Sequence, residues 1–198
     1  MSGQAANSIP AACDDDSLLD RMRRDDTEAY RALVERHIDR AYALALRILK
    51  STADAEDVTQ DAFVKTWQNR HQWQSGRAKF STWLYRVIVN RCIDLQRAPR
   101  RQWIEDVPEP IDDAEDVPTT LHKRQVYGQL DDALARLPPQ QRIALALSYH
   151  EDRSNREIAE VMGTSISAVE SLLKRGRQRL RELLKRAEGD VRNILGET

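Results

Sequence analysis

The most informative stretch of the chain is residues 137–180, with the sequence LPPQQRIALALSYHEDRSNREIAEVMGTSISAVESLLKRGRQRL. Apolar residues recur in it at intervals of three and four, which is typical of helices with one buried face. Ser154 and Glu157 form a capping box at the start of a short helix, and Gly163 ends that helix. A longer helix follows from Ile166, with polar and then basic residues on its exposed face. This order predicts a helix-turn-helix, although an ordinary helical hairpin has the same turn.

The rest of the chain predicts further amphipathic helices and no strand. Apolar residues at intervals of three and four predict helices over residues 18–23, 26–49, 54–67, 81–95, 126–137 and 143–149. Asp26 is a good N-cap for the longest of these helices, and Pro99 ends the fourth. Residues 71–80 contain Gly76 and mixed polar residues, so we expect a loop there, with a helix opening at Ser81 or Thr82.

The formal net charge of −1 hides strong local charge. Residues 104–120 contain seven acids, three prolines and no base, and such a segment cannot bury enough apolar surface to offset its ordering entropy. We therefore predict an all-α protein of two small helical domains, residues 17–98 and 120–187, joined by a flexible acidic linker at 99–119. Residues 1–16 are expected to form a disordered N-terminal tail, and residues 188–198 a C-terminal tail.

Each domain carries a basic cluster near its end. Residues 77–101 and residues 174–186 each contain seven bases and one acid. Two basic faces joined by an acidic segment suggest bipartite contact with nucleic acid, although solvated helix faces have the same composition.

Several other classes of protein are disfavoured. The four histidines are scattered, and no P-loop, dinucleotide glycine pattern or HExxH motif is present, so we expect no enzyme, metal or cofactor. Cys13 and Cys92 are far apart and predict neither a disulfide nor a metal-ligand pair. No apolar run is long enough to span a bilayer and the N-terminus is acidic, so we expect a cytoplasmic protein without direct membrane insertion.

Three segments together closely resemble the bacterial RNA polymerase sigma factors of the extracytoplasmic-function (ECF, group 4) family. They are DAEDVTQDAFVKTW (54–67), KFSTWLYRVIVNRCIDLQR (79–97) and the stretch at 137–180. The resemblance implies a sigma region 2-like domain that binds core polymerase and recognises and melts the minus-10 element, followed by a region 4-like domain that recognises the minus-35 element. The partners it implies are core RNA polymerase (the clamp helices of the largest subunit and the flap), promoter DNA and an anti-sigma factor that holds the protein inactive.

The resemblance also assigns residues to these contacts. The core-polymerase contacts carried over are Asp54, Glu56, Asp57, Gln60, Asp61 and Phe63. The minus-10 contacts are Trp73, Arg77, Lys79, Arg86, Asn90, Asp94 and Arg97. The minus-35 contacts are Ser165, Ser167, Ala168, Glu170, Ser171, Lys174, Arg175 and Arg177.

Some of these residues have a second interpretation. Phe63 is at least as well explained as a core residue, and Trp83 fits the core better than base stacking. Arg86 is equally suited to an intramolecular ion pair. Glu170 and Leu172 depart from the common family pattern, which has basic residues there. Glu170 either accepts a hydrogen bond from a cytosine amino group or pairs with a lysine one turn later.

Two other functions use some of the same features. A helix-turn-helix regulator would bind DNA without docking on polymerase, but it has no need of the motif at residues 54–63. A sigma mimic would sequester an anti-sigma factor, but it has no need of the two basic clusters.

Overall fold

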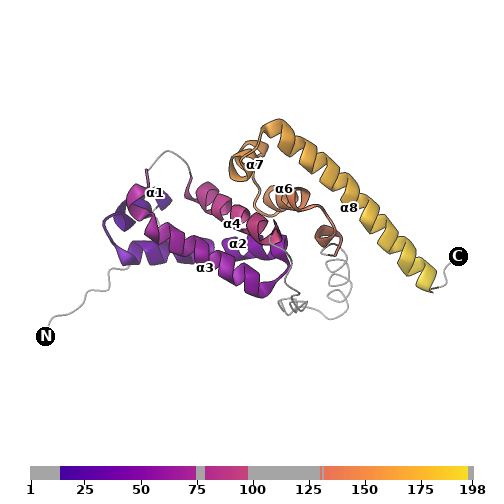
Figure 1. The fold of residues 1–198 in the computed structure, drawn as a ribbon, viewed down its shortest axis with the longest axis horizontal. Coiled ribbons are helices and arrows are strands. Elements are labelled where there is room, and N and C mark those ends of the chain that lie inside the picture. Colours follow the sequence, from indigo (N-terminus) through magenta and orange to yellow (C-terminus); the bar gives the residue numbers. More distant parts are fainter. Residues whose placement is uncertain (1–13, 75–78, 98–129, 131, 196–198) are drawn as a thin grey trace.

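The computed structural model describes residues 14–74, 79–97, 130 and 132–195, the last ten of these as backbone only. All regular structure in this part of the chain is helical (Figure 1). The predicted all-α class is therefore confirmed. The predicted acidic linker, Cys13 and Arg77 lie outside the described residues.

The first domain consists of α1 (Asp15–Met22), α2 (Thr27–Leu49), α3 (Thr52–Gln68), a 3-10 turn η1 (Arg70–Gln72) and α4 (Phe80–Arg97). Short polar side chains start the first three helices, because Asp14, Asp26 and Ser51 each accept a hydrogen bond from a backbone N–H of the first turn. The core contains the large side chains that are fully buried, Leu18, Leu19, Met22, Leu33, Leu44, Ile48, Phe80, Leu84, Tyr85 and Ile88.

Two boundaries in this domain differ from the sequence-based expectation. Helix α1 begins at Asp15, inside the expected tail, because Asp15 is tied to α2: its carboxylate oxygens lie 2.8 Å from His37 Nε2 and 2.7 Å from Arg36 Nη1. Hydrogen bonding to His37, opposed by burial, and a further bond to Arg36 lower the pKa of Asp15. Helix α4 begins at Phe80, inside the expected loop, because Phe80 is buried and its ring meets those of His37 and Trp73.

The second domain consists of α6 (Pro139–Tyr149), α7 (Asn155–Met162) and α8 (Ile166–Leu195), preceded by a helical stretch at residues 132–135. Both halves of the predicted Ser154–Glu157 capping box are present. Gly163 ends α7 in the left-handed conformation at φ 63°, which glycine adopts without strain. Helix α8 continues to Leu195, past the expected domain end at 187, and no proline interrupts it.

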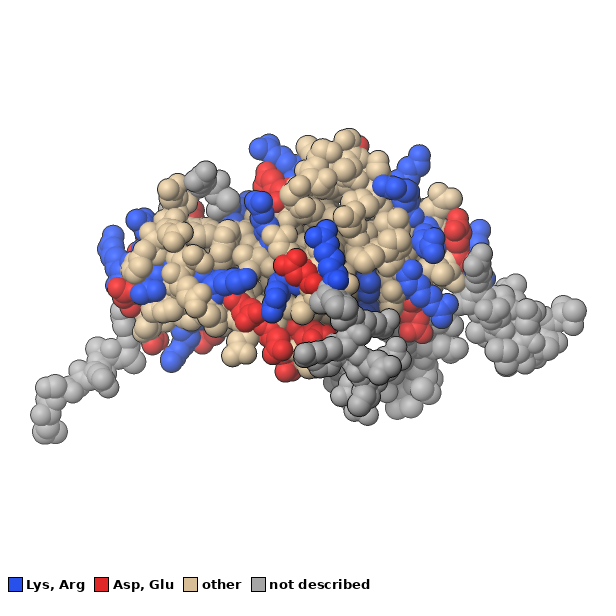
Figure 2. All heavy atoms as spheres, in the orientation of Figure 1, with Lys and Arg blue, Asp and Glu red and all other residues tan. Residues whose placement is uncertain are grey.

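The two domains pack against each other through α4 with α7 and through α2 with α6. Figure 1 shows α7 lying beside α4, while α8 runs along the outer side of the second domain. In Figure 2, acidic side chains gather over α3 and basic side chains follow α8. The fold thus presents faces of opposite charge on separate helices.

Candidate functional site

Helix α3 presents an acidic and amide-bearing face to solvent. Glu56, Asp57, Gln60 and Asp61 are exposed, whereas Asp54 is half-buried. The opposite face of the helix packs into the core through Ala55, Val58, Ala62 and Phe63.

Phe63 does not lie on this acidic face. Its side chain is 5% exposed, and its carbonyl accepts a hydrogen bond from the Tyr30 hydroxyl at 3.0 Å. The core interpretation of Phe63 is therefore the one that the structure supports. Asp61 lies 3.4 Å from Arg91 Nε of α4, and both side chains are about half exposed, so this ion pair contributes little to stability and leaves Asp61 accessible.

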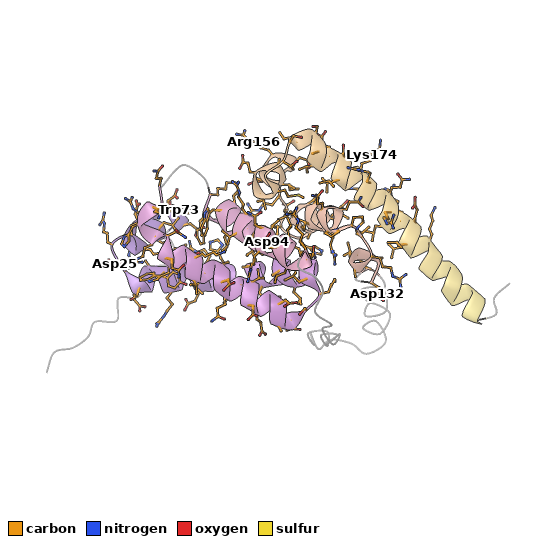
Figure 3. The ribbon with its side chains drawn as sticks, viewed as in Figure 1. Asp25, Trp73, Asp94, Asp132, Arg156 and Lys174 are labelled. Atoms are coloured by element: carbon orange, nitrogen blue, oxygen red, sulfur yellow. The ribbon has the colours of Figure 1, made fainter. Side chains whose placement is uncertain are left out.

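Helix α4 carries a mainly basic face. Arg86, Asn90, Asp94 and Arg97 are exposed at intervals of three and four, and Lys79 is exposed just before the helix. Such intervals place side chains on one face of a helix. Leu84, Ile88 and Cys92 form the buried face. In Figure 3, Asp94 lies toward the C-terminal end of α4 and Trp73 near its N-terminal end.

Trp73 belongs to an aromatic cluster at the start of α4. Its ring centroid lies 5.7 Å from both Phe80 and Trp83, at interplanar angles of 69° and 89°. Trp73 and Trp83 are both half-buried and pack against the core. The buried Nε1 of Trp73 has no hydrogen-bond partner among the described residues. Both tryptophans thus support α4 in this structure, which agrees with the core interpretation of Trp83.

The exposed face of α8 follows the helix-turn-helix turn. Ser167, Glu170, Ser171, Lys174, Arg175 and Arg177 are exposed. Val169, Leu172, Leu173 and Gly176 are buried on the other side, where a Cβ on Gly176 would lie 3.0 Å from Leu145 Cδ1. Figure 3 shows Lys174 on the outer side of α8. The hydrophobic residue at position 172 therefore serves packing, which explains one of the two departures from the basic family pattern.

The predicted minus-35 residues at the start of α8 differ in their surroundings. The Ser165 hydroxyl accepts a hydrogen bond from the Ala168 N–H at 3.2 Å and lies 3.1 Å from the Ser167 hydroxyl, so it caps α8. Ala168 is half-buried. Among the described residues, Glu170 and Lys174 do not form an ion pair with each other. Its carboxylate is accessible.

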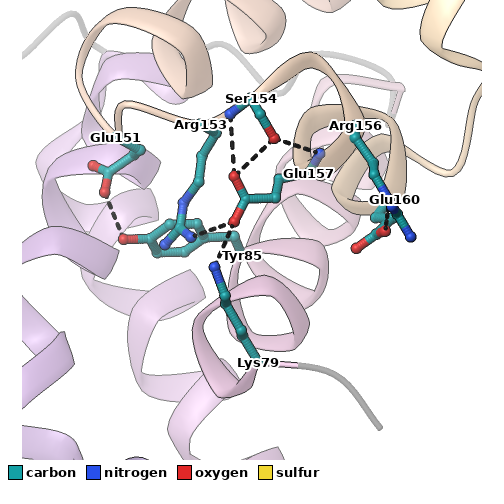
Figure 4. Close-up of polar contacts among 8 residues, drawn as sticks. All are labelled: Lys79, Tyr85, Glu151, Arg153, Ser154, Arg156, Glu157 and Glu160. Atoms are coloured by element: carbon teal, nitrogen blue, oxygen red, sulfur yellow. Dashed lines mark hydrogen bonds and ion pairs between the residues drawn. The ribbon is translucent and has the colours of Figure 1, made fainter.

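A polar contact joins the two domains (Figure 4). The Tyr85 hydroxyl of α4 donates to Glu151 at 2.5 Å, and the Arg153 guanidinium lies 5.0 Å from the centroid of the Tyr85 ring. Lys79 Nζ donates to Glu157 Oε1 at 3.0 Å. We call these five residues the interdomain contact. It uses Lys79, which the sequence had assigned to DNA.

Charge and burial at the interdomain contact shift two pKa values. Burial, with the Glu151 carboxylate as a second cause, raises the pKa of Tyr85 to about 12, so the hydroxyl stays protonated and donates. The hydrogen bond from Lys79, followed by one from the Ser154 N–H, lowers the pKa of Glu157 to about 2. Both groups therefore keep the protonation states that the contact requires at neutral pH.

Comparisons with known proteins identify the family. The family model of Sigma-70 region 2 matches residues 33–102, and that of Sigma-70 region 4 matches residues 127–180. The chain is 30% identical over 177 residues to the ECF RNA polymerase sigma-E factor of Haemophilus influenzae, covering 83% of this chain and 92% of that protein. The chain belongs to the ECF family of RNA polymerase sigma factors. Sigma factors are non-enzymatic factors that direct RNA polymerase in transcription initiation.

Two further comparisons extend this result. The sigma factor is 37% identical over 163 residues to the ECF RNA polymerase sigma factor SigE of Mycolicibacterium smegmatis; this covers 80% of the chain but spans only 63% of that relative. It is also similar to the solved structure of CnrH in complex with the cytosolic domain of CnrY. That match has a TM-score of 0.65 and 28% identity, over 86% of this chain and 97% of that chain. The match extends over both domains.

The sigma factor also has a groove where its two domains meet. A cavity of about 370 Å³ is lined by Ile93, Gln96 and Arg97 of α4, by residues 138–141 at the start of α6, and by Leu172 and Arg175 of α8. Arg97 and Arg175 were assigned to different promoter elements, yet they line the same groove. The arrangement in this structure therefore brings the ends of the two candidate DNA-binding faces together.

Three further observations concern metal ligands, membrane-spanning helices and the buried cysteine. They contain no cluster of three or more His, Cys, Asp or Glu side chains that could hold a metal ion. Across the same part of the chain, no helix is both long enough and apolar enough to cross a membrane. Cys92 is buried, and burial raises the pKa of its thiol to about 12, so the thiolate is not formed at neutral pH.

Sequence reasoning missed the interdomain contact. The capping box identified Glu157, but its partner Lys79 is 78 residues away, and no local pattern connects them. Tyr85 and Glu151 are likewise 66 residues apart. The only sequence signal was an aromatic residue and several charges at the ends of helices, which is too common to predict a pair.

Proposed function

We propose that this sigma factor binds core polymerase through the exposed face of α3 and recognises promoters through α4 and α8. The observation that carries the proposal is the separation of charge among three helices, each with a buried apolar face and an exposed polar one. An acidic face suits a basic protein surface, and basic faces suit nucleic acid.

The polymerase contact is assigned to Glu56, Asp57, Gln60 and Asp61, with Asp54 at its edge. These side chains lie on one outward face of a helix that is fixed by its core packing. Carboxylates and an amide held in this way match a basic partner such as the clamp helices of the largest subunit. The second domain would contact the polymerase flap.

The polymerase contact is testable with one substitution and a matched control. Asp61→Arg reverses the charge on the proposed face, so we expect weaker binding to core polymerase. Arg91→Ala removes the same Asp61–Arg91 ion pair but leaves the acidic face intact, so it should bind polymerase normally. Binding is measured by fluorescence anisotropy, and unfolding by circular dichroism. Equal polymerase affinity for wild type and folded Asp61→Arg would contradict this assignment.

The minus-10 contact is assigned to α4. Recognition of unpaired DNA uses hydrogen bonds to base edges and cations along the phosphates. Asn90 supplies an exposed amide in the middle of α4. Arg86 lies one turn before it, and Asp94 and Arg97 follow it toward the C-terminal end of the helix. We assign Asn90 to a base and the cations, including Lys79 and Arg77, to phosphates.

Asn90→Ala is expected to reduce promoter melting in a permanganate footprint, and an unchanged footprint would contradict the base contact.

The minus-35 contact is assigned to α8 as the recognition helix. The second helix of a helix-turn-helix lies in the major groove, where its N-terminal side chains reach base edges. Ser167, Glu170 and Ser171 are exposed in that part of α8, and Lys174, Arg175 and Arg177 follow. The accessible carboxylate of Glu170 is suited to accept a hydrogen bond from a cytosine amino group.

We further propose that an anti-sigma factor in the cytoplasm holds this protein in the arrangement described above. CnrH has a similar two-domain structure while bound to the cytosolic domain of CnrY. In the present structure Lys79 is bound to Glu157, and Arg97 and Arg175 line one groove. A protein that stabilised this contact would compete with promoter DNA for the same cations.

The overall proposal is tested by transcription from a pooled promoter library by core polymerase with and without the sigma factor. Discrete transcript starts that share two upstream elements are expected. Transcription no greater than with core polymerase alone, from folded protein, would contradict the proposal and favour the regulator or mimic functions.

A further inference from the structure

Ile166 is a large apolar side chain that lies exposed at the first position of α8. It is 46% exposed, whereas Val169, Leu172 and Leu173, which follow it in the same helix, are at most 9% exposed. Ile166 lies three residues before Val169 and seven before Leu173, and such intervals are typical of residues on one apolar face of a helix. Among the described side chains of α8, it is the one large hydrophobic residue that is exposed.

The fold of the turn does not require an isoleucine at this position. Gly163 supplies the left-handed conformation, and the Thr164 N–H donates to the Ala159 carbonyl at 3.0 Å. The Ser165 hydroxyl and carbonyl accept hydrogen bonds from the N–H groups of Ala168 and Val169. Isoleucine also has a lower helix propensity than unbranched residues. Among the described residues, the structure therefore shows no way in which an exposed isoleucine at position 166 stabilises the free protein.

The surroundings of Ile166 are those of the proposed DNA-binding face. Ile166, Glu170 and Lys174 follow one another at intervals of four, which places them along one edge of α8. The N-terminal end of a recognition helix is the part that approaches base edges. In the major groove of B-DNA, the apolar group on a base edge is the C5-methyl of thymine.

We propose that Ile166 is a specificity-determining residue that contacts the C5-methyl group of a thymine in the minus-35 element. The inference rests on the proposed function of α8 in binding the minus-35 duplex, and adds to it the identity of one base.

The test uses full-length sigma factor with core polymerase and a strong promoter from the library. Each minus-35 thymine, on either strand, is replaced in turn by deoxyuridine, which lacks only the methyl group. We expect one replacement to weaken holoenzyme binding about fourfold, the value for loss of one buried methyl-sized group. Ile166→Ala should bind the thymine and deoxyuridine promoters almost equally, and Ile166→Val should retain most of the difference.

Ile38→Ala is the matched control, because Ile38 is 39% exposed but lies on α2 in the other domain. This control should keep the wild-type sensitivity to deoxyuridine. Equal binding of wild type to every deoxyuridine promoter would overturn the inference. So would an Ile166→Ala effect on polymerase binding with no effect on thymine sensitivity, which would assign Ile166 to a protein contact.

Arg175→Ala separates failure of this inference from failure of the proposed function. If Arg175→Ala weakens minus-35 binding while deoxyuridine has no effect on wild type, α8 binds DNA and only the thymine contact is wrong. If neither Arg175→Ala nor any change of the minus-35 sequence alters binding, both the proposed function of α8 and the inference are wrong.

Discussion

The two candidate DNA-binding helices differ in their surroundings. Helix α4 packs against α7, and Lys79 and Tyr85 at its N-terminal end are bound to Glu157 and Glu151 of the second domain. Helix α8 points the polar side of its N-terminal half outward, where Glu170 and Lys174 are exposed. We therefore expect Lys79 to reach DNA only when the domains separate at this contact, whereas the start of α8 is accessible without that movement.

The largest expected effect comes from the buried side of α4. Ile88 is fully buried, so Ile88→Ala removes core contacts and leaves a cavity. We expect a loss of about 2–5 kcal/mol in the free energy of unfolding, measured by urea denaturation. Asn90→Ala, two residues away on the exposed side, should change it by less than about 0.5 kcal/mol. Similar losses for the two variants would contradict the assignment of faces.

A smaller effect is expected from breaking the interdomain contact at Tyr85. The Glu151 side chain is 5% exposed. Besides the Tyr85 hydroxyl, its carboxylate faces Arg47, whose Nη1 lies 4.0 Å from Glu151 Oε1. Tyr85→Phe therefore leaves a buried carboxylate without its donor and should favour domain separation by about 2 kcal/mol. FRET between dyes on cysteines introduced at Val64 and Gln178, in a Cys13→Ser background, should report the greater separation.

Tyr149→Phe is the control for that measurement. It removes an equivalent hydroxyl from a side chain that is 63% exposed and whose ring lies 5.6 Å from the Arg177 guanidinium of its own domain. Its FRET should match wild type. Unchanged FRET in Tyr85→Phe would show that the tyrosine hydrogen bond does not hold the domains together.

The two lysines offer a further comparison at the level of DNA binding. Lys174→Ala should lower the dependence of log affinity on log salt concentration by about one, because one phosphate contact is lost. Lys79→Ala loses a phosphate contact but also frees Glu157, and the two effects oppose each other. Its net effect on holoenzyme affinity for a full promoter should therefore be smaller. A larger loss for Lys79→Ala would contradict the competition between the interdomain contact and DNA.

The smallest expected effect is the pH dependence of the interdomain contact. The pKa of Glu157 is lowered from 4.5 to about 2, so its stabilising effect is complete above about pH 4.5 and is lost as the pH falls toward 2. Interdomain FRET should decrease over that range. Lys79→Gln removes the first cause of the shift, so the decrease should begin at higher pH. An identical pH profile would exclude Lys79 from the contact in solution.

Local sequence patterns predicted what depends on neighbours in the chain. The capping box at Ser154 and Glu157, the turn at Gly163 and the amphipathic helices all follow from spacing within one or two turns. The exposure of Ile166 and the burial of Leu172 did not follow, because periodicity gives the faces of a helix but not the elements that cover them. The Lys79–Glu157 pair joins separate domains, so it required the tertiary structure.

The most direct test of the account compares promoter selection by three proteins. Wild type, Asn90→Ala and Arg175→Ala are each combined with core polymerase and the promoter library, and transcript 5′ ends are sequenced. The account predicts that Asn90→Ala changes preference only in the minus-10 element and Arg175→Ala only in the minus-35 element. Unchanged preferences in both variants, or a change in the opposite element, would contradict the assignment of α4 and α8.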